Sequence, residues 1–223
     1  MKPHTILHMM SSIDGRIVVT HWPKDFDVAD AYDQVHQQLA GDAWIVGPTT
    51  MAEFGEGEPK PVATGEVFPR ETWKAPGAEQ GPYAIALDRK GRLHLNTGRA
   101  NGDAIVIVLT TRVADAHLAE LRRDGISYLF AGDDDINLPL ALDRLAREFG
   151  IRRLLLEGGG GINGAFLDAG LIDEISLMVL PLADGTRGAP TLFDRPQGKV
   201  PTLKLQSVTR LDHDVLHLRY LTQ

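Results

Sequence analysis

The stretch LLLEGGGGINGAFLDAG, residues Leu154–Gly170, places four glycines in a row between an apolar run and an amphipathic one. Glycine inside a helix or strand costs about 0.5–1 kcal/mol relative to alanine. A chain that places it four times running at one junction indicates backbone conformations or close approaches that a Cβ atom would prevent. We therefore expect a ligand here, such as a phosphate or a flat ring. Close packing of helix against strand is the alternative.

The junction belongs to a chain in which short apolar strands alternate with helices. Strands are expected over 5–10, 43–46, 83–88, 104–110, 126–130, 153–157 and 174–181, and helices over 29–41, 115–125, 137–150 and 162–170. Continuous apolar strands of this kind predict a largely parallel sheet covered on both faces. The last two strands, over 202–211 and 214–221, are expected to form an antiparallel hairpin. The pattern predicts one α/β domain spanning residues 1–223.

Composition and charge exclude several classes of function. The chain has 223 residues, a formal net charge of −7 and no cysteine, which excludes disulfides, thiolate metal sites and a cysteine nucleophile. The negative charge argues against a nucleic-acid partner. No apolar run approaches the roughly 18 residues of a membrane span, and the N-terminus does not resemble a signal peptide. We expect a cytoplasmic protein without membrane partners.

Two acidic or flexible segments have more than one interpretation. The run Asp133–Asp135 is expected to be a solvated loop, with a metal site as the minor alternative, and no metal site is expected elsewhere. Residues 55–82 are rich in Gly, Pro and Glu and show little periodicity. A loop of that length is more often functional than idle.

The glycine run also fits a dinucleotide-binding pattern. The segment Gly159–Gly164 satisfies G-x-G-x-x-G after a strand and before a helix. That motif normally opens a doubly wound domain, whereas too few parallel strands follow it here. A domain of that type is therefore disfavoured.

Four motifs in order resemble a known family. They are SIDGRI at 12–17, DAWIVGPTTM at 42–51, ALDRKGRL at 86–93 and LLLEGGGGINGAFLDAGLIDEISLMVLPLADG at 154–185. Together they resemble the reductase domain of riboflavin biosynthesis, the RibD C-terminal domain. The resemblance implies a three-layer α/β/α dihydrofolate-reductase-like fold, NADPH as cofactor and a homodimer. It also implies reduction of a ribosylaminopyrimidine by hydride transfer, as in 5-amino-6-(5-phosphoribosylamino)uracil reductase. The zinc deaminase domain that accompanies this reductase needs cysteines and is absent.

The resemblance also implies where the cofactor binds. The residues expected to contact it are Gly158, Gly159, Gly160, Gly161, Ile162 and Asn163, then Gly47, Thr49 and Thr50, and finally Thr110, Thr111 and Arg112. In this family a pair of glycines like those in the first group is often joined by a cis peptide bond. The second group follows a strand at a helix start and suits the diphosphate, although Thr49 is equally a plain helix cap. The third group suits an adenosine 2′-phosphate through charge-assisted hydrogen bonds.

Two carboxylates are candidates for catalysis. Asp14 lies in the S-x-D-G element and is expected, with Ser12, to bind substrate, or to deliver a proton. Its alternative interpretation is an ordinary turn aspartate before Gly15. Glu157 ends a strand against the glycines, where partial burial would raise its pKa towards a value useful in proton transfer.

Departures from the family pattern leave the substrate open. The helix before Gly41 carries Gln37 and Gln38 where the riboflavin enzymes usually carry Arg, so fewer basic groups are available for a phosphoribosyl substrate. Two other functions are therefore considered. One is a binding module that holds NADPH without turnover, and the other is a dihydrofolate or pterin reductase.

Overall fold

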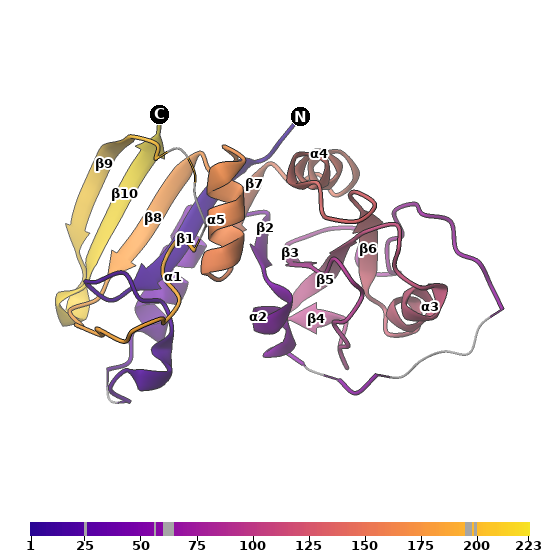
Figure 1. Ribbon diagram of the computed structural model, residues 1–223, viewed down its shortest axis with the longest axis horizontal. Coiled ribbons are helices and arrows are strands. Elements are labelled where there is room, and N and C mark those ends of the chain that lie inside the picture. The colour runs from indigo at the N-terminus through magenta and orange to yellow at the C-terminus, as the bar shows by residue number, and fades with distance from the viewer. Residues whose placement is uncertain (25, 56, 60–64, 195–197, 199) are drawn as a thin grey trace. The chain divides into compact units, whose positions relative to one another are not determined.

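The computed structural model describes residues 1–223 apart from 25, 56, 60–64, 195–197 and 199 (Figure 1). Its elements in chain order are β1 (His4–Ser11), η1 (Val19–His21), α1 (Ala29–Leu39), β2 (Ala43–Val46), α2 (Pro48–Ala52), β3 (Tyr83–Leu87), β4 (Arg99–Ala100), β5 (Asp103–Leu109), α3 (Asp115–Arg123), β6 (Ser127–Phe130), α4 (Leu138–Glu148), β7 (Arg153–Leu156), α5 (Gly160–Asp168), β8 (Glu174–Val179), β9 (Leu203–Arg210), η2 (Asp212–Asp214) and β10 (Leu216–Thr222). The chain forms two compact units, residues 1–3 with 42–152 and residues 4–41 with 153–223. Among the described residues, no helix is both long and apolar enough to cross a membrane.

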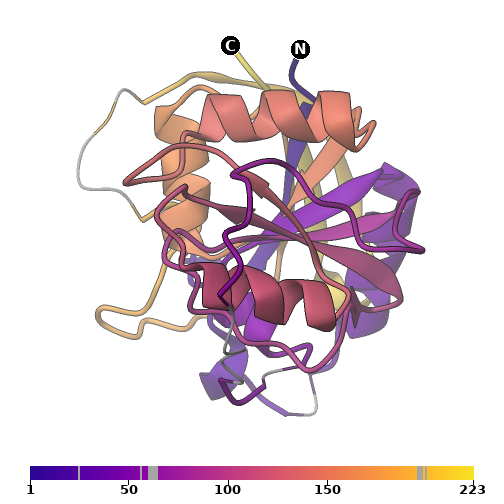
Figure 2. The same ribbon diagram turned by 90° about the vertical axis from the view of Figure 1, so that its right-hand side faces the viewer.

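The first unit is built on four parallel strands in the order β2, β3, β5 and β6, with the short β4 antiparallel to β5. Figures 1 and 2 show α3 and α4 on opposite faces of these strands. The strands are apolar throughout because both faces are covered, and Ile85, Val106 and Leu129 are fully buried. Helix α4 begins where the Asn137 side chain accepts a hydrogen bond from the Leu140 backbone N–H at 3.0 Å.

The second unit combines parallel and antiparallel strands. Strand β1 lies between β7 and β8, parallel to both, with Leu7 paired to Leu156 and to Ile175. Strand β10 is antiparallel to β8, and β9 is antiparallel to β10 at the outer edge. The fold is therefore mixed α/β with mostly parallel strands and a C-terminal antiparallel hairpin, and this prediction from the sequence is confirmed. The expectation of a single domain stays a prediction.

The C-terminal hairpin contains one irregularity that changes its surface. Ser207 pairs with Arg219 and Leu205 pairs with Tyr220, so Gln206 has no partner opposite it on β10. An extra residue in one strand shifts the alternation of side chains beyond it. The side chains of Leu203, Leu205 and Val208 consequently fall on one face.

Much of the long segment before β3 packs on the first unit. The backbone of Trp73 exchanges hydrogen bonds of 2.9 and 3.0 Å with Tyr128 of β6. Arg70 donates to the carboxylate of Asp115 at 2.6 Å and to the carbonyl oxygen of Thr111 at 3.0 Å, which ties this segment to the start of α3. Residues 56 and 60–64 lie outside the described part of the segment, and its expected functional role stays a prediction.

Candidate functional site

The glycine run forms the entry to α5. Gly159 is the N-cap residue, with φ −64° and ψ 170°, which is a conformation open to any residue. Among the described residues the only cis peptide bond joins Gly81 to Pro82, so the cis bond implied for the glycine run by resemblance is wrong. None of the positive φ angles falls in the run either. Conformational freedom is therefore not the reason for these glycines.

Lack of room for a side chain explains one of the four glycines, Gly160. A Cβ atom on Gly160 would overlap the Thr191 carbonyl oxygen and the Asp194 carboxylate, whereas a Cβ on Gly159 or Gly161 would meet nothing within 4 Å. Gly160 is therefore required by packing, and its carbonyl oxygen accepts a hydrogen bond from the Asp194 N–H at 3.0 Å. Gly159 and Gly161 are exposed, so the structure leaves room beside them.

Asn163 and Ile162 lie in the first turn of α5. Asn163 is fully buried and donates from Nδ2 to the Leu192 carbonyl oxygen at 3.0 Å, while its Oδ1 has no hydrogen-bond partner. Ile162 is half-buried. The Asn163 side chain thus holds the 191–194 segment against α5, and its expected contact with a cofactor stays a prediction.

Glu157 lies at the carboxyl end of β7, next to the glycines. Its side chain is 11% exposed and its Oε1 is 2.7 Å from Nδ1 of His36, which α1 supplies. Burial raises the pKa of Glu157, with the His36 ion pair acting in the opposite direction. The Tyr32 hydroxyl also interacts with this carboxylate. The expected burial and raised pKa of Glu157 are confirmed.

A buried polar network continues from Glu157 into the strands. The ring of His8 stacks on Tyr32 at 4.2 Å between centroids, and its Nδ1 lies 3.2 Å from the Ser176 hydroxyl. That hydroxyl is 2.8 Å from Nε2 of His217 on β10. Burial lowers the pKa of His8 to about 4, so its ring is neutral at physiological pH. The network joins β1, β8, β10 and α1 behind the carboxylate.

Sequence reasoning missed His36 and Tyr32 as partners of Glu157. Both fall in the helix expected over 29–41, and helical periodicity cannot say which side chain on a helix face meets a distant strand end. A histidine and a tyrosine on the otherwise apolar face of α1 were the available signal. Buried polar side chains on such a face need partners.

Asp14 is held in a tight turn after β1. Its carboxylate accepts hydrogen bonds from the Ser12 hydroxyl at 2.7 Å and from the backbone N–H groups of Asp184 and Gly185 at 3.1 and 3.0 Å. These donors lower the pKa of Asp14 to about 2. A group that stays ionised is a poor proton donor, so this geometry favours a turn or binding role for Ser12 and Asp14. Asp14 and Glu157 have separate sets of partners.

In the first unit, a groove of about 960 Å³ runs beside the start of α2. Thr49 lines it, and the charged lining is mixed. The cationic residues all follow β3 and the acidic ones come from three segments: Arg89, Lys90 and Arg92, and Glu53, Glu58 and Asp88. A groove of this size is suited to a small-molecule ligand. Sequence reasoning had used ALDRKGRL only as a family motif and had missed these cations as groove residues.

The other residues expected near α2 are less accessible. Gly47 is buried and Thr50 is half-buried, whereas Thr49 is exposed. Helix α2 has only five residues, so its helix dipole is small. The expected contact of these three residues with a diphosphate stays a prediction.

Each side chain of the segment Thr110–Arg112 already has a hydrogen-bond or ion-pair partner. The Thr110 side chain is buried and its hydroxyl donates to the Arg89 carbonyl oxygen at 2.9 Å. The Thr111 hydroxyl donates to Asp133 at 2.7 Å, and Arg112 pairs with Asp134 at 2.5 Å. Arg89 in turn pairs with Asp135 at 3.3 Å. The exposed run of three aspartates therefore covers two arginines and one threonine.

The sequence matches one protein family along nearly its whole length. The RibD C-terminal domain family matches residues 3–217. The 2,5-diamino-6-ribosylamino-4(3H)-pyrimidinone 5′-phosphate reductase of Methanothermobacter thermautotrophicus is 29% identical over 198 residues, covering 87% of this chain and 85% of the relative. The enzyme of the same name from Archaeoglobus fulgidus is 26% identical over 202 residues, covering 87% of each chain.

Solved structures share the fold. A pyrimidine reductase-like protein from Corynebacterium diphtheriae has a TM-score of 0.72 at 18% identity, covering 99% of this chain and 92% of its own. The riboflavin biosynthesis reductase Rib7 of Saccharomyces cerevisiae has a TM-score of 0.63 at 16% identity, covering 100% and 90%. At these identities the likeness establishes the fold alone. The family match covers residues 3–217, and the fold is consistent with it. The chain therefore belongs to the RibD C-terminal domain family.

Proposed function

We propose that this chain is an NADPH-dependent reductase that converts the ribose of a ribosylaminopyrimidine 5′-phosphate into a ribityl chain. The observation that carries the proposal is Glu157, a buried carboxyl with a raised pKa at a strand end beside exposed glycines. In this reduction the bond between C1′ and the ring oxygen breaks, C1′ gains a hydride and the ring oxygen gains a proton. Because burial raises the pKa of Glu157, its carboxyl group suits the second transfer.

The residues present fit a nicotinamide dinucleotide. Gly159 and Gly161 leave open space where a side chain would stand, and the first unit has a groove with three cationic residues in its lining. Gly158 to Asn163 are the candidate cofactor contacts of the second unit. Thr49, Arg89 and the Thr110–Arg112 segment are those of the first, and each group is tested by its own substitutions. Bound NADPH supplies the hydride, and the role left to the protein is alignment and proton delivery.

Two substrates that differ at one position of the pyrimidine are the main candidates. The 2,5-diamino-pyrimidinone has an amino group where 5-amino-6-(5-phosphoribosylamino)uracil has an oxygen. We propose the diamino compound, because the two archaeal relatives named for it match along 85–87% of their own length. The uracil, which the sequence motifs suggested by resemblance, is the second candidate.

Steady-state turnover tests this assignment. Purified chain is mixed with NADPH and each pyrimidine, NADPH loss is followed by absorbance, and mass spectrometry checks that the product has gained two hydrogens. We expect reduction of the diamino compound with the higher kcat/KM. NADPH binding without turnover of either pyrimidine would instead support a non-catalytic binding module. Turnover of dihydrofolate or a pterin alone would support the third function.

Arg112→Ala is expected to weaken NADPH binding about tenfold and to leave NADH binding unchanged. A charged hydrogen bond contributes about 1.5–3 kcal/mol, and the lower end applies because Arg112 is 72% exposed and paired with Asp134. Arg89→Ala should act in the same way, because Arg89 pairs with Asp135, the chain neighbour of the Asp134 that pairs with Arg112. The measurement is the dissociation constant of each cofactor by fluorescence titration. Arg147→Ala, a surface arginine paired with Asp143, is the control. Equal losses for both cofactors would contradict the 2′-phosphate assignment.

We also propose a homodimer formed through the face of β9 and β10. Leu203, Leu205, Val208 and Leu216 are 40–54% exposed, and the pairing of the strands places them on one face. Contiguous exposed apolar side chains of this kind mark an association surface. Light scattering should give twice the chain mass, and Leu205→Arg should give a monomer with unchanged circular dichroism. Lys204→Glu, on the opposite face, should stay dimeric, and a wild-type monomer at all concentrations would end the proposal.

A further inference from the structure

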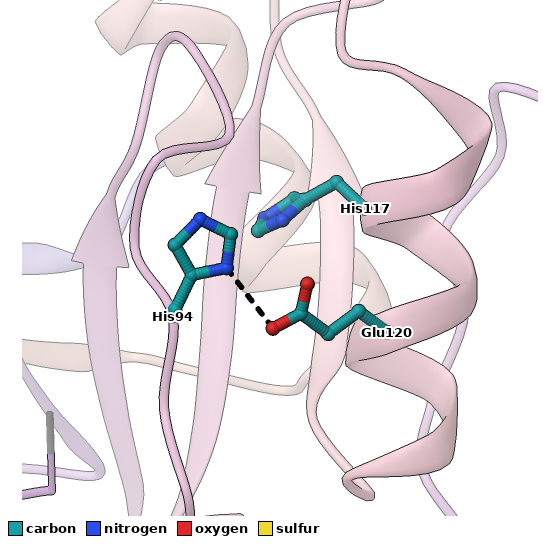
Figure 3. A group of neighbouring side chains, drawn as sticks. All are labelled: His94, His117 and Glu120. Atoms are coloured by element: carbon teal, nitrogen blue, oxygen red, sulfur yellow. Dashed lines mark hydrogen bonds and ion pairs between the residues drawn. The ribbon is translucent and has the colours of Figure 1, made fainter. Parts of the chain in front are cut away.

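Three potential metal ligands converge in the first unit (Figure 3). His117 and Glu120 are three residues apart on α3, which places both side chains on the same side of the helix. His94, in the segment that follows β3, faces them. One donor atom from each residue lies within 4.8 Å of the others, and Nδ1 of His94 is 3.0 Å from Oε1 of Glu120.

His117 is the unusual member of the group. It is 7% exposed, and neither of its ring nitrogens has a hydrogen-bond partner. Burying a polar group without a partner costs free energy, and most buried polar atoms in proteins are satisfied. In Figure 3 its ring stands beside the His94 ring and the Glu120 carboxylate. His117 therefore has a ring nitrogen available as a metal ligand within the group.

The electrostatic surroundings favour a cation. Glu120 is 3% exposed, and the buried Asp88 carboxylate is near enough to affect His117. Asp88 also accepts hydrogen bonds from the N–H groups of Arg92 and Leu93 at 2.6 and 2.7 Å, and so fixes the segment that carries His94.

We propose that His94, His117 and Glu120 bind a divalent transition-metal ion, with Zn²⁺ as the best match. Two imidazoles and a carboxylate are a known zinc ligand set, and bond lengths of ~2.0–2.1 Å place tetrahedral donors ~3.3 Å apart. The described donors lie within 4.8 Å of one another, so the side chains would move closer by up to about 1.5 Å around the ion. His94 also lines the groove, which gives the ion a route in from solvent. The bound ion ties the cationic segment after β3 to α3 and so orders one wall of the groove.

Sequence analysis did not identify this cluster, and we expected no metal site outside the aspartate run. The signal that was available is a His-x-x-Glu pair on a predicted helix. The third ligand is distant in sequence and reaches the helix only because β3 and β5 are neighbours in the sheet. No spacing rule connects His94 to α3.

Zinc titration of untagged, chelator-treated protein tests the proposal. Calorimetry should give one site per chain, Co²⁺ should give the intense visible absorption of a tetrahedral site, and Zn²⁺ should raise the melting temperature. His94→Gln, at a partly exposed position, and Glu120→Gln should each weaken binding by at least the ~10–100-fold that loss of an outer-shell partner costs. His4→Gln is the control, because His4 also faces two carboxylates, Asp173 and Glu174, on the surface.

The outcomes separate a built site from surface binding. Loss of zinc binding in His94→Gln and Glu120→Gln, with His4→Gln unchanged, supports the proposal. Wild-type protein without a stoichiometric site overturns it, as does His94→Gln that binds zinc as tightly as the wild type. In either of those cases the His94–Glu120 hydrogen bond and the burial of His117 serve only the packing of α3. Circular dichroism on each variant confirms that the comparison is between folded proteins.

Discussion

Glu157→Gln should lower kcat by about 10²–10⁴-fold and leave the NADPH dissociation constant nearly unchanged, because general acid catalysis contributes about that much. Gln keeps the shape of the side chain but has no proton to transfer. The fold should tolerate it. Since burial raises the pKa of Glu157 in the folded state, its stabilising contribution is present at low pH and is lost as the pH rises through that pKa. A neutral amide has no such loss, so the melting temperature at neutral pH should stay the same or rise.

The pH profile adds an independent readout of the same residue. If the protonated form of Glu157 is the active one, kcat of the wild type should fall as the pH rises through its raised pKa. The variant should lose this limb and keep a low, flat rate. Asp14→Asn is the matched comparison, because the pKa of Asp14 is about 2 and it holds no proton over this range. A large loss of kcat in Asp14→Asn with none in Glu157→Gln would reverse the proposed roles.

Gly159→Ala should weaken NADPH binding by an order of magnitude or more while the melting temperature barely changes. At φ −64° alanine is unstrained, and its methyl group meets no protein atom within 4 Å. A positive φ at this residue would have added a cost of about 1 kcal/mol, and the observed backbone angle removes that cost. A loss of affinity in a protein of normal stability would then come from the methyl group and the cofactor alone.

Gly160→Ala should show the opposite pattern, a loss of stability, at the residue next to Gly159. Its methyl group must displace the Thr191 carbonyl and the Asp194 carboxylate, so the free energy of unfolding should fall by about 1–3 kcal/mol. Gly161→Ala, also open, should behave like Gly159→Ala. Calorimetric melting and cofactor titration on the same samples give both quantities. Unchanged affinity in both Gly159→Ala and Gly161→Ala would place the cofactor elsewhere.

Local sequence patterns predicted most of the secondary structure because the determinants of these elements are local. The strand at 43–46 is a short apolar run before a Gly-Pro turn, and α4 has a capping Asn137 and a terminating Gly150 within its own sequence. The two-residue β4 was missed, because its only support is a pairing with β5. A strand of two residues is too short to show a periodic pattern of apolar side chains.

The candidate site was predictable only in part. Glu157 was identified because a carboxylate at a strand end beside glycines is a local feature, and its burial followed from the apolar strand. Its contact with His36 depends on how α1 packs on the strands, which the sequence of either element does not specify. Likewise, Arg112 was expected to await a phosphate, whereas the aspartate run that pairs with it comes from a separate loop.

The unpaired Gln206 lets β9 absorb one extra residue without altering what the outer strand presents to its surroundings. Deleting Gln206 would give a regular strand in which Leu205 and Ser207 still pair with Tyr220 and Arg219, so Leu203, Leu205 and Val208 would stay on one face. Pairing every residue one for one with Gln206 kept would instead move Val208 to the face opposite Leu203 and Leu205. A one-residue gap at this point between two otherwise similar proteins is therefore neutral for assembly, and an alignment that penalises it would overstate their difference.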